Sequence, residues 1–198
     1  MEDDIISRTR RCAELAQMLL AADEEARYEE PKDMREALLR LYYAVNLEEE
    51  MEACKALLTE DTSEEAVDAV HDAAEIVRAA SDAAFGLIER YGASDAGFAA
   101  KIDKLRLDDA DDGLFDLLCK LYKCEGIIRM AYRCATWYPA YGPSDTLLDA
   151  WKGSIPEGPW GVDPESFIEQ AMDMNIMELL DIRAELIRKI APMAEEMH

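Results

Sequence analysis

The sequence predicts an all-α protein, a helical bundle of about five main helices, from its composition and from the spacing of its apolar residues. Only 9 glycines and 7 prolines occur among 198 residues, and the helix-favouring residues Ala, Leu, Glu, Met and Arg are abundant. Apolar side chains recur every three or four residues over long stretches, which is the period of one helix face. We expect one helical domain over residues 1–198, with a long connection before the last helix.

Two long helices are expected in the first third of the chain. The first covers residues 4–28. Pro31 begins the second at its first helical position, where the missing N–H of proline costs nothing. The second helix continues to residue 58, and its apolar stripe contains Met34, Leu38, Leu41, Tyr42 and Val45.

Start and stop signals delimit the third predicted helix. Thr62 or Ser63 can act as N-cap, and Glu65 stands three residues after Thr62, as a capping box requires. Gly92 follows the last apolar positions and is a natural end residue. A short helix is expected next, over residues 94–105.

The last third of the chain contains two helices separated by the long connection. The fourth main helix is expected over residues 114–136 and is the most apolar. Residues 137–162 then combine Trp and Tyr with four prolines and several glycines, which indicates a long ordered connection. Asp163 and Pro164 supply a cap and a first-position proline for the last helix, which reaches about residue 190.

The chain is strongly acidic, with 44 Asp and Glu residues against 21 Lys and Arg residues and a formal net charge of −23. Such a charge repels nucleic-acid phosphates and anionic lipids, so we expect no direct binding to nucleic acid or to a membrane. It attracts basic protein surfaces and divalent metal ions. Acidity that serves only solubility, or adaptation to a salt-rich host, would give the same composition.

The cysteines and the N-terminus indicate a cytoplasmic protein. The five cysteines form no C-x-x-C pair and have mostly apolar neighbours, which is typical of reduced, buried thiols. The first residues are acidic and lack the basic and apolar regions of a signal peptide. No window approaches the roughly 18 apolar residues of a membrane-spanning helix.

One group of carboxylates has the pattern of a metal site. Glu48, Glu49 and Glu52 form E-E-x-x-E on the second predicted helix, and Asp72 and Glu75 follow on the third. Antiparallel helices with these residues could aim several carboxylates at shared Mg²⁺ ions, which prefer oxygen ligands and activate water. The layout is similar to that of MazG-like nucleotide pyrophosphohydrolases, all-α enzymes with E-E-x-x-E on one helix and E-x-x-D on the next. The order of the second pair is reversed here. The resemblance implies Mg²⁺-dependent hydrolysis of a nucleotide.

Other observations favour a protein without enzymatic activity. The same glutamates would lie in solvent if the apolar face of the second helix switches sides near Asn46. His71 is the only histidine before the C-terminal residue, and no serine or cysteine motif points to it as a base. No glycine-rich phosphate loop occurs. Apart from the metal hypothesis, we expect no catalytic residue and no cofactor.

Five aromatic residues gather at the long connection. Tryptophan and tyrosine are favoured anchors in protein interfaces, so these side chains could form a partner-binding patch beside the acidic surface. They could equally close the open end of the bundle. The five residues are Trp137, Tyr138, Tyr141, Trp151 and Trp160.

The sequence therefore favours a non-enzymatic interaction protein that binds a basic protein surface. Acidic helix faces can mimic the charge of nucleic acid, because the same Lys and Arg side chains bind carboxylates and phosphates. Such a protein would act as an inhibitor. The alternatives are the MazG-like enzyme and a peptide-binding chaperone or adaptor with a groove lined by Met172, Met174 and Met177. The uneven apolar faces of the second and last helices also leave room for a homodimer.

Overall fold

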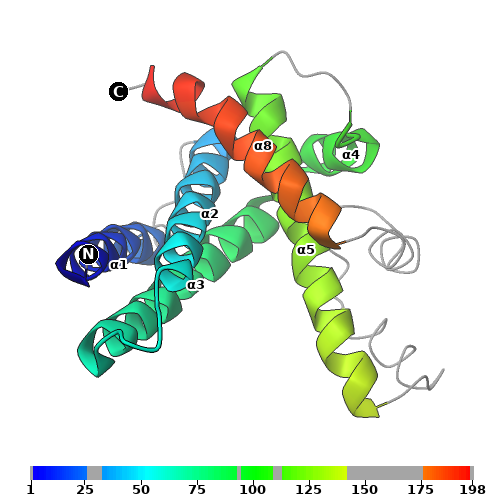
Figure 1. Cartoon of the computed structure of the whole chain (residues 1–198). Helices are drawn as coiled ribbons and strands as arrows, with labels where there is room; N and C mark the ends of the chain where they lie inside the picture. Colours follow the sequence, from blue (N-terminus) through cyan, green and yellow to red (C-terminus); the bar gives the residue numbers. More distant parts are fainter. Residues whose placement is uncertain (1, 26–32, 93–94, 109–112, 142–175, 197–198) are drawn as a thin grey trace. The chain divides into compact units, whose positions relative to one another are not determined.

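The computed structural model describes residues 2–25, 33–92, 95–108, 113–141 and 176–196. This part of the chain is helical and contains no strand (Figure 1). The predicted all-α class with about five main helices is confirmed. The helices are α1 (Glu2–Glu25), α2 (Met34–Ala56), α3 (Glu64–Gly92), α4 (Ala96–Lys104), α5 (Leu114–Tyr141) and α8 (Ile176–Glu195).

The chain forms two compact units, Met1–Ile88 and Glu89–His198, and the boundary falls inside α3. Each unit is described by itself below. The expectation of a single domain over residues 1–198 stays a prediction.

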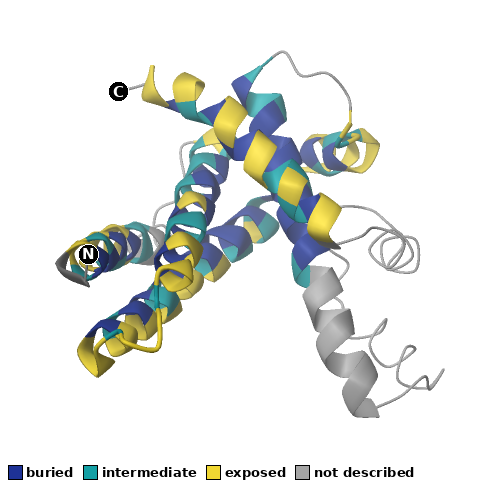
Figure 2. Cartoon of the chain, in the orientation of Figure 1, coloured by how far each residue is buried: buried dark blue, intermediate teal, exposed yellow. Residues whose placement is uncertain are grey.

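In the first unit, α1, α2 and most of α3 share a core. Each helix has one buried face and one exposed face (Figure 2), because its apolar residues recur with the period of the helix. The shared cluster contains Ile5, Cys12 and Ala16 of α1, Leu47, Met51 and Cys54 of α2, and Val70, Ala73, Val77 and Ala80 of α3.

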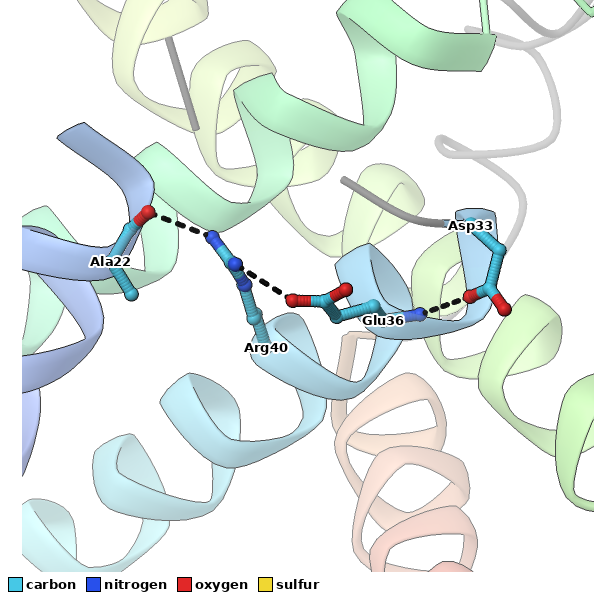
Figure 3. A network of polar contacts seen from close by, with 4 residues as sticks. All are labelled: Ala22, Asp33, Glu36 and Arg40. Carbon is cyan, nitrogen blue, oxygen red and sulfur yellow. Dashed lines mark hydrogen bonds and ion pairs between the residues drawn. The ribbon is translucent and has the colours of Figure 1, made fainter. Parts of the chain in front are cut away.

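Two arginines join α1 to α2. Arg8 contacts Glu50 through two nitrogens, with Nε 2.8 Å and Nη2 2.7 Å from Oε1. Arg40 donates to the carbonyl oxygen of Ala22 at 3.0 Å and to Oε1 of Glu36 at 2.9 Å (Figure 3). The last carbonyls of a helix lack partners within the helix, so Arg40 satisfies one at the end of α1.

The predicted start of the second helix is wrong. α2 begins at Met34, with Asp33 as its N-cap. The backbone of Asp33 is extended, at φ −161° and ψ 167°, and therefore cannot belong to the helix. Its Oδ1 accepts a hydrogen bond from the backbone N–H of Glu36 at 2.9 Å (Figure 3), as Asp does at N-caps. Pro31 lies outside the described residues.

The start of α3 lies where it was predicted, but the hydrogen bonds at this helix start differ from the predicted capping box. The side chain of Ser63 accepts a hydrogen bond from the N–H of Ala66 at 3.3 Å, so Ser63 caps the helix. Thr62 instead accepts one from the N–H of Thr59 at 2.8 Å. The predicted capping box between Thr62 and Glu65 is therefore wrong, because the Thr62 hydroxyl accepts its hydrogen bond from the turn that precedes the helix.

The second unit is built around α5, against which α4 and α8 pack (Figure 1). Tyr122 of α5 is fully buried, and its ring centroid lies 5.9 Å from that of Phe98 on α4. The buried positions of α5 include Leu117, Leu118, Leu121, Cys124, Ile127 and Ile128.

Lys123 of α5 fixes the C-terminal end of α4. Its Nζ donates to the carbonyl oxygens of Ile102 at 3.0 Å, Asp103 at 3.1 Å and Leu105 at 2.7 Å. A cation at this place also suits the negative end of the helix dipole. At the other end of α4, Asp95 is the N-cap, so the short helix predicted over residues 94–105 has nearly the observed bounds.

A buried carboxylate joins α5 to α8. Glu125 is 2% exposed. Arg183 of α8 donates to its Oε1 at 3.3 Å, and Nε of Arg129 lies 3.8 Å from its Oε2. The thiol of Cys124 donates to the carbonyl oxygen of Leu179 at 3.5 Å. Because a buried charge is tolerated only with partners, these contacts specify how α8 packs on α5.

Two helix ends differ from the prediction. α5 continues to Tyr141, beyond the expected end at residue 136. α8 includes Pro192 and ends at Glu195, beyond the expected end near residue 190. The predicted start of this last helix, at Asp163 and Pro164, lies outside the described residues.

Candidate protein-binding surface

The start of α3 and the loop before it carry an acidic surface, here called the acidic face. No Lys or Arg occurs in the sequence between Lys55 and Arg78. All the acidic residues in this interval are exposed: Glu60, Asp61, Glu64, Glu65, Asp68, Asp72 and Glu75.

The helical period explains why these carboxylates share the exposed side. The buried positions of α3 in this stretch are Ala66, Val70, Ala73 and Val77, which recur every three or four residues and face the core. The acidic residues fall between them and remain in solvent. Glu64 and Glu65 lie in the first turn, where the positive end of the helix dipole stabilises negative charge.

Within the described part of the chain, the acidic face has almost no cationic partner. Glu75 lies 3.7 Å from Nε2 of His71, and both side chains are 73% exposed. Lys55, the nearest preceding cation in sequence, instead bonds Glu52 at 2.6 Å. The side chains of the other six acidic residues form no hydrogen bond or ion pair with a described residue. Side chains three or four residues apart on a helix are neighbours, with Cβ atoms about 5–6 Å apart. The negative electrostatic potentials of these neighbouring carboxylates therefore add.

Two exposed apolar side chains belong to the same region of the chain. Val67 is 40% exposed and stands in sequence between the carboxylates of Glu65 and Asp68. Leu57, just after α2, is 38% exposed. The surface therefore offers apolar contact area as well as negative charge.

The predicted metal ligands lie on the same two helices but do not form one cluster. Glu52 pairs with Lys55, and Asp72 and Glu75 are exposed on the acidic face. Glu48 and Glu49 are half-buried. No three His, Cys, Asp or Glu side chains among the described residues form a group that could hold a metal ion. Magnesium binding and the MazG-like activity stay predictions without geometric support in this part of the chain.

The predicted aromatic patch lies mostly outside the described residues. The backbone at Trp137, Tyr138 and Tyr141 is part of α5, whereas these residues were expected in the connection after the helix. Their side chains are not described, and Trp151 and Trp160 lie beyond the described ranges. A partner-binding role for these residues stays a prediction.

The predicted methionine groove is described at one position only. Met177 of α8 is 61% exposed, while Met172 and Met174 lie outside the described residues. The chaperone or adaptor alternative therefore stays a prediction.

Sequence reasoning missed several residues of the acidic face. It selected Asp72 and Glu75 as metal ligands and used Glu65 only as a helix-start signal. The signal that would have found the whole surface is the long interval without Lys or Arg, combined with the apolar period of α3.

The fold and this surface define an all-helical protein with a largely unneutralised acidic face. Comparison of the chain with protein-family models, curated proteins and solved structures finds no match. No described helix combines the length and apolar composition needed to cross a bilayer.

Proposed function

We propose that the protein is a non-enzymatic interaction protein whose acidic face binds a basic surface of another protein. The observation that carries this proposal is the set of six exposed carboxylates without a cationic partner in the described chain. Neighbouring like charges repel one another along α3. A partner that brings Lys and Arg side chains would replace this repulsion by attraction and would be steered to the face by its field.

The apolar residues define the partner further. Val67 and Leu57 are partly exposed within or beside the acidic face, and apolar contact supplies affinity that exposed ion pairs alone do not. We therefore propose a partner segment that presents Lys and Arg around at least one apolar side chain. An amphipathic basic helix has this pattern.

Mimicry of nucleic acid is the more specific form of the proposal. Basic surfaces that bind phosphates also accept carboxylates, because both are anions that accept hydrogen bonds from Lys and Arg. An acidic face that occupies such a surface would inhibit a nucleic-acid-binding protein. A reducing compartment such as the cytoplasm suits the four described cysteines, which are free thiols.

The test compares two variants with the same change in net charge. The first removes charge from the acidic face through Asp68→Asn, Asp72→Asn and Glu75→Gln. The control removes three exposed charges from α8 through Glu178→Gln, Asp181→Asn and Glu195→Gln. The probe is a synthetic amphipathic helical peptide with Lys and Arg on one side and Leu on the other, and fluorescence anisotropy measures its Kd.

The acidic-face variant is expected to bind the peptide about tenfold more weakly than the unmodified protein. Exposed ion pairs contribute about 0.2–1 kcal/mol each, and three of them at about 0.5 kcal/mol correspond to roughly tenfold in Kd. The control is expected to change Kd less than threefold. Equal losses in both variants would show that only overall charge matters, and the proposed face would then be wrong.

The mimicry form needs its own measurement. The same peptide is first bound to a labelled DNA duplex, and the protein is then added. The unmodified protein is expected to release the DNA at lower concentration than the acidic-face variant does. If the protein binds the peptide yet leaves the DNA complex intact, the interaction stands and the mimicry fails.

A further inference from the structure

We draw no further inference here: the strongest candidate, the outer face of α1 around the exposed Leu15 and Met18, is an apolar face of the first unit, and nothing in the structure shows what covers it.

Discussion

Replacing Lys123 by methionine is expected to destabilise the second unit by about 2 kcal/mol. The ammonium group bonds three carbonyl oxygens at the end of α4, at 2.7–3.1 Å. The bonds to Ile102 and Leu105 are partly buried, whereas the bond to Asp103 is exposed. Methionine keeps most of the apolar stem and a good helix propensity, so the substitution removes mainly the charge and its hydrogen bonds.

The magnitude follows from the two partly buried bonds. Water can replace the exposed bond to Asp103, so it contributes little. A hydrogen bond to a charged group contributes about 1.5–3 kcal/mol, and two such bonds give at least about 3 kcal/mol. Burial of the ammonium group opposes this gain, since desolvation lowers the pKa of Lys123. A net loss of about 2 kcal/mol remains.

Two measurements and one matched control test the effect. Urea unfolding gives the change in stability, and hydrogen exchange of the α4 amides shows whether the loss is local to that helix. Lys104→Met makes the same chemical change at the exposed end of α4 and is expected to cost less than about 0.5 kcal/mol. If the two variants lose equal stability, or α4 exchange is unchanged in Lys123→Met, the three-carbonyl contact does not stabilise α4.

Two further predictions concern buried groups of α5. Burial raises the pKa of Cys119 and of Cys124 to about 12 from an ordinary value of 9.0. The folded state therefore retains these protons at higher pH, and the associated stability, fully present below pH 9, is lost as the pH rises towards 12. Urea midpoints should fall above pH 9, and less steeply in a Cys119→Ala/Cys124→Ala variant; equal slopes would exclude the thiols as the cause. Glu125→Gln should cost about 3 kcal/mol, because it removes the buried carboxylate that pairs with Arg183 and Arg129. In urea unfolding, the exposed Glu178→Gln should be nearly neutral, and a similarly small effect at Glu125 would refute the role given to its ion pairs.

Helix positions were predictable because their signals are local. The apolar period places each buried face, and Ser63 and Gly92 mark the ends of α3 within a residue or two. Helix ends were less predictable where two local signals compete. Pro31 and Asp33 both suit a helix start, and α2 begins after Asp33, whose Oδ1 accepts a hydrogen bond from the N–H of Glu36.

The end of α5 illustrates the same limit. The run from Trp137 to Pro139 reads as the end of a helix, because proline removes one backbone hydrogen bond and clashes in a helix interior. The backbone nevertheless remains helical to Tyr141. The helix ends two residues after Pro139, so the proline marks the end of α5 to within one turn.

Contacts between helices were not predictable in the same way. Lys123 and Glu125 stand in an apolar stretch, and the sequence shows only that such charges require partners. The partners of Lys123 are backbone carbonyls about twenty residues earlier in sequence. One partner of Glu125 is Arg183, on the far side of the long connection. Neither pairing follows from spacing, because both depend on how separate helices pack.

The acidic face was predictable in part, since its carboxylates follow local helix spacing but its lack of cationic partners depends on contacts between side chains. Composition predicts an acidic surface, and helix spacing predicts which carboxylates of α3 are exposed. Only the structure shows which of these carboxylates lack a cationic partner. Lys55 pairs with Glu52 within α2, and Arg8 of α1 pairs with Glu50 of α2. Like charges four residues apart, as at Asp68 and Asp72, cost about 0.2–0.5 kcal/mol per pair. Burial of the opposite side of α3 offsets that cost in the free protein, and a basic partner would remove it. The proposed binding therefore draws on repulsion that is already present between neighbouring carboxylates of α3.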